Sequence, residues 1–291
     1  MKKTFLAVFT LFASVTIQAQ FYVSATGGYA VGANEKVLGS NVSSAGISEL
    51  EGSYGEGLHT QIRGGYFFNE KVGIELGVGY VFGFDQDISK TSGVPSLPES
   101  NVVGRGRAFG ASLVGIYNFT DKVYVRAGLL TKLGGKTEAR GTVNTTLPLY
   151  DQTGNVIAAP APTSIDFTTN FRGEFPIGFV GAIGYKFPIS DNLSLFAEVE
   201  YMNIDVTRDT SDLGAFSSIR TDGRVVTRDE LANTIAVLTS PASSLPDSTK
   251  ASLSSLSYLI RDEFTWGTEG TIKPDAPYSS FGINIGVMYS F

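Results

Sequence analysis

The chain has 291 residues, with 22 basic and 28 acidic side chains, one histidine and no cysteine. This acidic balance argues against nucleic acid as a partner, because binding to phosphate backbones needs a basic surface. The lack of cysteine excludes a disulfide framework, so a large core or a lipid environment must stabilise the fold. The 34 glycines and 12% aromatic residues suit a β protein whose backbones pack closely.

Residues 1–20 have the layout of a secretory signal peptide. Lys2 and Lys3 precede an apolar run over residues 5–17, and Ala19 is a small residue suited to a cleavage site. A buried helix or a membrane anchor is the alternative, but the run is shorter than the roughly 20 apolar residues that a spanning helix needs. We therefore expect export and cleavage near Ala19, which leaves 20 basic against 28 acidic residues.

The rest of the chain contains eight runs in which apolar side chains occupy every second position, the period of a β-strand. In the last run, Phe281, Ile283 and Ile285 alternate with small or polar residues. No stretch after the leader is long enough for a transmembrane helix, so a membrane could be crossed only by strands. The runs begin near Phe21, Leu58, Val72, Phe109, Val123, Phe175, Leu193 and Phe281.

The connections between these runs alternate between short and long. Short polar turns are predicted at 69–71, 120–122 and 188–192. Residues 151–155 and 221–223 have the composition of hairpin tips, which predicts strands that extend beyond the membrane. Short turns on one side and long loops on the other are typical of an outer-membrane barrel, whose turns face the periplasm. The long loops are expected at about 34–54, 85–105, 135–171 and 207–276.

Four of the runs end in the motif Tyr-x-Phe, always on the side of the short turns. Tyrosine and phenylalanine favour the boundary between lipid and water, so the motif predicts an aromatic girdle there. A soluble sandwich or a lipocalin-like barrel would bury the same apolar faces but would not require this coincidence. The predicted girdle residues are Tyr66, Phe68, Tyr117, Phe119, Tyr185, Phe187, Tyr289 and Phe291.

The predicted fold is all-β: an eight-stranded antiparallel up-and-down transmembrane β-barrel over residues 21–291, with two short helices in its last extracellular loop. In this architecture, and in its closing strand 281–291, the chain resembles the small outer-membrane β-barrel superfamily of the OmpA, OmpX and Opa type. The resemblance implies a bacterial outer-membrane location with periplasmic termini. It also implies contact with outer-membrane lipid and lipopolysaccharide, and recognition of the last strand by the outer-membrane assembly machinery.

Charged residues out of phase with the apolar face point into the barrel, where we predict an ion-pair network. Pairing Phe68 with Val72 sets Gly65 opposite Glu75 and Arg63 diagonal to it, within reach of a long side chain. Glu198 and Glu200 lie on one face of one strand, so both can ionise only if cations such as Arg63 or Arg126 offset their repulsion. Two inward carboxylates would also permit acid–base catalysis, but an eight-stranded barrel is narrow enough to be filled by structural side chains. No cofactor or metal is predicted. The network residues are Arg63, Glu75, Arg126, Glu198 and Glu200.

His59 is the one histidine of the chain, and its phase points it inward near the outer mouth of the barrel. We predict a polar residue at the rim. The alternative is an envelope enzyme such as a lipid A acylase or an omptin-like protease, which would need a serine or a carboxylate beside this imidazole. No triad partner is recognisable in the sequence, so we predict that the protein is not an enzyme.

The last loop contains two helical patterns. Thr227 and Glu230 form a capping box before an apolar stripe over residues 231–238, and a second stripe covers residues 248–264. We predict that the helices pack on each other and over the barrel mouth as a lid or binding head. Marginal order is the alternative, because short helices are weak without tertiary contacts.

Three classes of function are compatible with such a barrel. The first is a surface protein that anchors loops for adhesion, for binding an unknown extracellular ligand or for envelope integrity. The second is a transporter or narrow channel for small or hydrophobic solutes, favoured by the glycines of the inner wall. The third is an enzyme that modifies lipid A or cleaves peptides. We favour the first, because a charge-filled lumen leaves little room for transport.

Overall fold

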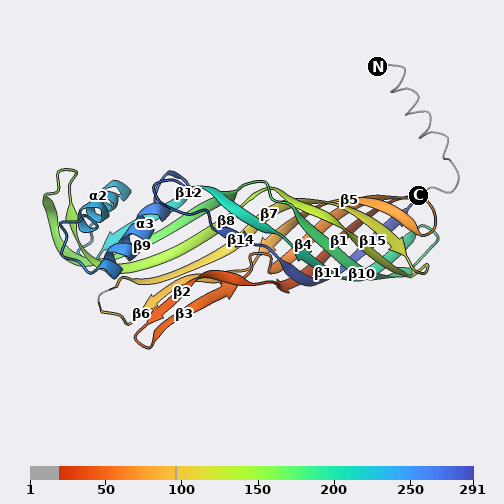
Figure 1. The fold of residues 1–291 in the computed structure, drawn as a ribbon, viewed down its shortest axis with the longest axis horizontal. Helices are drawn as coiled ribbons and strands as arrows, with labels where there is room; N and C mark the ends of the chain where they lie inside the picture. Colours follow the sequence, from red (N-terminus) through yellow and green to blue (C-terminus); the bar gives the residue numbers. More distant parts are fainter. Residues whose placement is uncertain (1–19, 96) are drawn as a thin grey trace, which may run out of the picture.

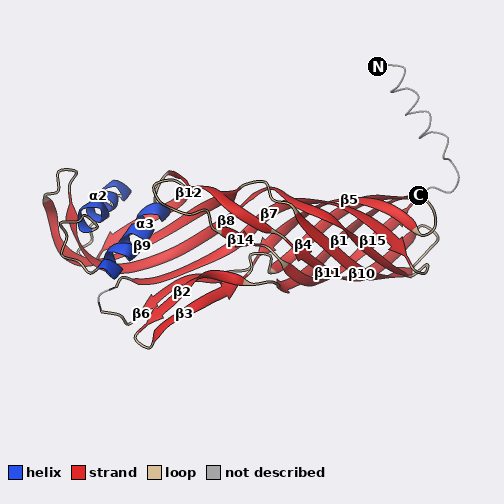
Figure 2. Cartoon of the chain, in the orientation of Figure 1, coloured by secondary structure: helices blue, strands red, loops and turns tan. Residues whose placement is uncertain are grey.

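The computed structural model describes residues 20–95 and 97–291. The predicted signal peptide therefore lies outside the described residues, apart from Gln20. The molecule is elongated, with a closed barrel at one end and a curved sheet bearing two helices at the other (Figure 1). Strands make up nearly all of the regular structure (Figure 2). No helix in the described residues is long and apolar enough to cross a membrane.

Eight antiparallel strands form the barrel, which confirms the predicted fold class. Each strand pairs with the next around the ring, and the last pairs with the first, so that no edge is left open. The apolar residues of the predicted outer face are exposed or half-buried, as the alternation requires. The strands are β1 (Gln20–Gly32), β4 (Gly57–Phe67), β5 (Val72–Gly83), β7 (Glu99–Asn118), β8 (Val123–Tyr150), β10 (Gly178–Pro188), β11 (Leu193–Asn203) and β15 (Ser280–Ser290).

The three predicted short turns are confirmed, and side-chain hydrogen bonds hold two of them. In the first, the Phe68 N–H donates to the Val72 carbonyl at 2.9 Å, while the Asn69 side chain accepts from the Val72 N–H at 2.9 Å. Thr120 caps the second turn in the same way, through the Val123 N–H at 2.9 Å. Asn and Thr side chains thus replace the ladder bonds that a turn loses.

Strands β7 and β8 are 20 and 28 residues long. Both continue beyond the barrel and carry a second sheet there. Its order is β13-β12-β9-β8-β7-β6-β2-β3, so the segments predicted as long loops consist largely of strands. The predicted hairpin tip at 151–155 is confirmed between β8 and β9. We call this sheet with its helices the extension. Its further strands are β2 (Lys36–Ser43), β3 (Gly46–Gly52), β6 (Gln86–Ser92), β9 (Val156–Gly173), β12 (Asp205–Arg220), β13 (Glu263–Thr265) and β14 (Asp275–Pro277).

Two helices lie on the extension, α2 (Arg228–Leu238) and α3 (Asp247–Leu259). The predicted capping box at Thr227 is confirmed, with both reciprocal hydrogen bonds to Glu230 present. The second helix was predicted to reach residue 264, which is wrong. Phe264 belongs to β13 and pairs with Ser211 of β12, so sheet pairing and aromatic packing override the helical stripe.

The helices pack on each other as predicted, but their predicted position over the barrel mouth is wrong. Their apolar residues join one buried cluster with the inner face of β8 and β9, far from the barrel (Figure 1). The mouth is closed instead by two segments around Tyr54 and Tyr278, whose rings lie 5.9 Å apart. Backbone hydrogen bonds from Tyr54 to Pro277 and from Tyr278 to Ile204 fix both segments.

Candidate functional site

The lumen brings together the five charged residues singled out by their inward phase. Arg63 binds Glu198 through two hydrogen bonds of 2.5 and 3.1 Å. Arg126 donates to Glu75 at 3.0 Å and to Glu198 at 3.3 Å, and it also contacts Glu200. All five side chains are at most a few per cent exposed. Cations and carboxylates therefore form one connected cluster, which we call the luminal network.

Of the carboxylates that the sequence offers to Arg63, the structure pairs it with Glu198 and not with Glu75. Gly65 does lie opposite Glu75 as the register predicts, yet Arg63 reaches across the lumen to Glu198 of β11. On the intervening strands, Ser24 of β1 lies opposite Arg63 and Asn284 of β15 lies opposite Glu198, so only short side chains stand between the two. The Glu75 carboxylate is bound instead by Arg126 and by the Tyr22 hydroxyl at 2.8 Å.

Neutral donors complete the coordination of the three carboxylates, which outnumber the two guanidinium groups. Tyr124 donates to Glu198 at 2.9 Å and Asn284 donates to it at 3.2 Å, while Gln61 donates to Glu200 at 2.9 Å. Hydrogen bonds to charged forms stabilise buried carboxylates that would otherwise be costly. The acceptors are thus engaged in holding strands together, which favours a structural role over acid–base chemistry.

Glycines make room for the two tyrosines that the sequence analysis missed. A Cβ atom on Gly65 would lie 2.2 Å from the ring of Tyr22, and one on Gly184 would lie 2.3 Å from the ring of Tyr124. Both tyrosines have the inward phase and stand directly opposite these glycines in the register. An inward tyrosine facing an inward glycine was therefore the signal that could have identified them.

The turn end of the lumen is closed by packed side chains below the luminal network. Phe67 and Phe196 belong to a buried apolar cluster at this end, together with both tyrosines. The Lys186 ammonium lies 5.2 Å from the ring centroids of Phe67 and Tyr124, within the range of a cation–π contact. The lumen is accordingly filled at this level.

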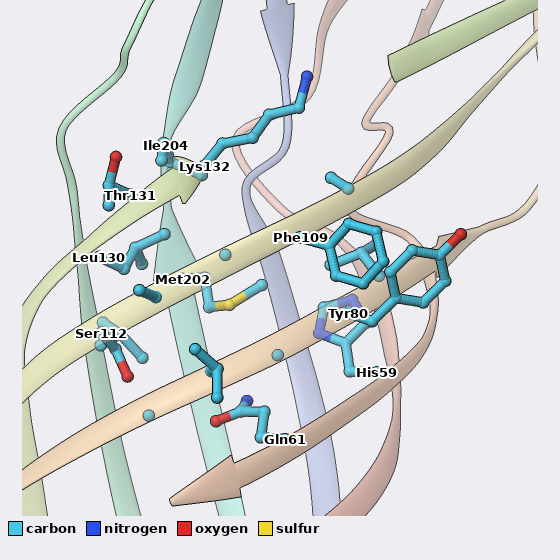
Figure 3. A pocket seen from close by; sticks show the side chains of 18 of the residues that line it. His59, Gln61, Tyr80, Phe109, Ser112, Leu130, Thr131, Lys132, Met202 and Ile204 are labelled. Atoms are coloured by element: carbon cyan, nitrogen blue, oxygen red, sulfur yellow. The ribbon is translucent and has the colours of Figure 1, made fainter. Parts of the chain in front are cut away.

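Between the luminal network and the mouth lies a cavity of about 80 Å³ (Figure 3). Gln61 and Met202 line it from the barrel wall, and Lys132 and Tyr278 border it toward the mouth. His59 also lines this cavity and is only 4% exposed, so its prediction as a rim residue is wrong. The closing segments bury the imidazole, whose Nε2 lies 2.7 Å from the Gly55 carbonyl oxygen.

This carbonyl is the one hydrogen-bond partner of His59 within residues 20–95 and 97–291. A nucleophilic or acid–base role would require a serine or a carboxylate at that position. The geometry around His59 therefore gives no support to an envelope enzyme.

The predicted girdle residues all lie at the turn end of the barrel, where they form four Tyr–Phe pairs. The ring centroids within each pair are 5.3, 5.1, 4.7 and 5.1 Å apart in chain order. Phe68, Phe119, Phe187 and Phe291 are all more than half exposed. Such a row is suited to the boundary between lipid and water.

The far end of the extension carries a groove of about 1,030 Å³, which the sequence analysis did not foresee. The ends of β8, β9 and β12 line one side, and α2, α3 and residues of the segment between β6 and β7 line the other. Arg220 fixes one wall, because its guanidinium donates to the carbonyls of Leu147 and Ala159 at 3.0 and 2.6 Å. Thr145, Thr221 and Leu253 also face this space.

Family models identify residues 5–223 as an outer membrane protein beta-barrel domain. The chain belongs to this family. It is therefore a protein of the bacterial outer membrane, with its eight strands as the membrane-spanning part. A comparison with curated proteins gives no match.

The chain is also similar to several solved structures. OprG from Pseudomonas aeruginosa is 12% identical, with 94% of this chain and 96% of that chain covered and a TM-score of 0.38. A major outer membrane protein from Thermus thermophilus is 12% identical, with 94% and 100% covered and a TM-score of 0.35. Neisserial surface protein A is 12% identical, with 93% and 97% covered and a TM-score of 0.32.

Proposed function

We propose that this outer-membrane barrel is a non-enzymatic surface protein whose extension binds a ligand outside the cell. Its short turns and both termini face the periplasm, and its extension projects outward. The observation that carries the proposal is the groove of about 1,030 Å³ at the far end of the rigid extension. Loops and sheets presented on a rigid scaffold are common sites of binding.

The rigidity of the extension follows from its own apolar core. Leu149 and Ile165 of the sheet and Leu231 of α2 are fully buried, and Leu253 of α3 is 1% exposed. Burying each such side chain stabilises the extension by roughly 1.5–3 kcal/mol. Connections that served only to join barrel strands would not need a core of this kind, since four residues suffice between the strands at the other end.

A channel is the main alternative, and the lumen gives it little support. The luminal network and the packed aromatic residues fill the barrel from the turn end, and Tyr54 and Tyr278 close the mouth. The cavity of about 80 Å³ lies between these two filled levels. In planar bilayers we expect no discrete conductance steps from the intact protein, and steady steps would favour the channel.

Binding by the groove can be tested on intact cells. Cells expressing the protein are applied to arrays of immobilised glycans and matrix proteins, with empty-vector cells as reference. We expect retention on at least one surface, abolished by the paired substitutions Thr145→Trp and Thr221→Trp, which fill the groove. Gln152→Trp on the exposed hairpin tip should leave retention unchanged. Retention no greater than that of empty-vector cells on every surface would refute the proposal.

A further inference from the structure

Arg208 of β12 lies over two aromatic rings on the inner face of the extension. Its guanidinium carbon is 3.9 Å from the ring centroid of Phe171 and 4.8 Å from that of Trp266. The register of β12 against β9 shifts between Arg208 and Thr210, and such a bulge re-aims a side chain. The indole N–H of Trp266 donates to the Ser211 hydroxyl at 3.1 Å, which fixes the ring beside the guanidinium.

The guanidinium of Arg208 has no counter-charge. Its side chain forms no ion pair or hydrogen bond with the described residues, and its Nε atom is buried without a partner. The nearest carboxylates along β12 are bound by lysines, Asp205 by Lys36 at 2.7 Å and Asp209 by Lys273 at 3.2 Å. A buried cation without a partner destabilises a fold, and an anion that binds it removes this cost.

The hydroxyl of Tyr54 is a second donor without a partner. Tyr54 is 3% exposed, and its side chain forms no hydrogen bond with any residue that the structure describes. The neighbouring Tyr278 differs, because its hydroxyl lies 2.7 Å from the Thr137 hydroxyl. Buried donors normally have an acceptor, so Tyr54 also lacks one.

A short series of contacts joins Tyr54 to Arg208. The rings of Tyr54 and Tyr278 lie 5.9 Å apart, and Thr137, which contacts Tyr278, stands directly opposite Phe171 in the register of β8 and β9. Burial raises the pKa of Tyr54, and the positive charge of Arg208 opposes this rise. Both donors therefore lie in one region, at the border between the apolar cluster under the helices and the cluster that closes the mouth.

We propose that Arg208 and Tyr54 bind the carboxylate group of a small organic acid, whose apolar body lies against Phe171 and Ile88. A guanidinium presents paired N–H donors in one plane, which match the two oxygens of a carboxylate. The single positive charge is neutralised by a monoanion, whereas a phosphate dianion would keep an uncompensated charge. Ile88 packs against both clusters and supplies apolar surface beside the donors.

This site is separate from the groove at the far end of the extension. Neither Arg208 nor Tyr54 lines that groove. The binding of an organic acid therefore does not depend on the proposed ligand outside the cell, and either proposal can fail without the other.

The one tryptophan of the chain, Trp266, adjoins Arg208 and reports on the site. The full-length folded protein in detergent micelles is titrated with sodium hexanoate at constant ionic strength, and tryptophan emission is recorded. We expect a saturable change, with a Kd raised about tenfold or more in Arg208→Met, which loses the charge-assisted hydrogen bonds. Arg172→Met, which removes an exposed arginine of β9, should bind like the wild type. Equal Kd values for the wild type and Arg208→Met, or no saturable change in the wild type, would overturn the proposal.

A milder variant tests the second donor. Tyr54→Phe removes one hydroxyl and keeps the ring that closes the mouth, so it is informative even where Arg208→Met fails to fold. It should weaken hexanoate binding several-fold, and unchanged binding would overturn the role of Tyr54. Protection of the amides of α2 and α3 from hydrogen exchange verifies that the extension of each variant is folded.

Three further probes identify the ligand class. Hexanol, which has the same chain without the charge, should give no saturable change; a response equal to that of hexanoate would rule out carboxylate recognition. Sodium chloride and inorganic phosphate should compete poorly with hexanoate. Competition by either at equal concentration would overturn the assignment to an organic acid and indicate a site for inorganic anions.

Discussion

The ring of Tyr124 occupies the space beside Gly184, its direct partner on β10, and from there the tyrosine hydroxyl reaches Glu198 at 2.9 Å. A methyl group on Gly184 would lie 2.3 Å from this ring, so Gly184→Ala must displace the tyrosine. We expect a loss of about 1–3 kcal/mol in the free energy of unfolding, typical of an overpacked core.

Urea unfolding of the protein in lipid vesicles measures this loss. Gly64→Ala is the matched control, since a Cβ atom there meets nothing within 4 Å. Equal stability of the two variants would show that Tyr124 is not held in this position.

Arg126 is the cation that connects Glu75, Glu198 and Glu200. Arg126→Met keeps much of the side-chain volume but leaves buried carboxylates without their charge partner. Loss of one partner from a buried network costs roughly 3–5 kcal/mol, so we expect a large drop in the urea midpoint. Lys122→Met on an exposed turn should have almost no effect. A drop of similar size in both variants would argue against a stabilising role of the luminal network.

The start of α2 depends on the capping box between Thr227 and Glu230. The backbone N–H of Thr227 donates to the carboxylate at 3.0 Å, which lowers the pKa of Glu230 from its usual value of 4.5. Replacing the capping residue, as in Thr227→Ala, should cost about 1 kcal/mol and speed up amide hydrogen exchange in α2. Ser255→Ala on the exposed face of α3 should not speed up exchange in α2.

The hydrogen bond between Thr227 and Glu230 also makes the stability of α2 depend on pH. Because the pKa of Glu230 is lower in the folded state, its stabilisation is fully present above about pH 4.5 and is lost as the pH falls through the folded pKa. Exchange in α2, corrected for the intrinsic rate, should therefore be constant from pH 8 to pH 5 and rise below about pH 4. A loss of protection that begins near neutral pH would contradict this origin.

Much of the barrel could be predicted from the sequence because its contacts are local and periodic. Alternation revealed the strands, and a short turn sets the register of its hairpin, so that Gly65 could be placed opposite Glu75. The sequence left open whether Arg63 binds Glu75 or the pair Glu198 and Glu200. Its partner Glu198 lies across the lumen on β11, and which contact forms depends on the short side chains of the strands between.

Apart from the hairpin tips at 151–155 and 221–223, which predicted strands beyond the membrane, the extension was hidden for a related reason. Its sheet contains a parallel pairing of β2 with β6, and its edge strand β13 has only three residues, which overlap a helical stripe at Phe264. Such pairings join segments far apart in the chain and leave no regular pattern in either one. From their polar composition, these segments were therefore predicted as loops.

The most direct test of the proposed topology is labelling of single cysteines, because the chain contains no native cysteine. Thr153 lies at the far tip of the extension, and Asp121 lies on an exposed turn at the other end of the barrel. Each is replaced by cysteine in a separate variant, Thr153→Cys and Asp121→Cys. An impermeant maleimide applied to intact cells should label the Thr153 variant at once and the Asp121 variant only after the outer membrane is permeabilised. Immediate labelling of the Asp121 variant, with protection of the Thr153 variant, would contradict it.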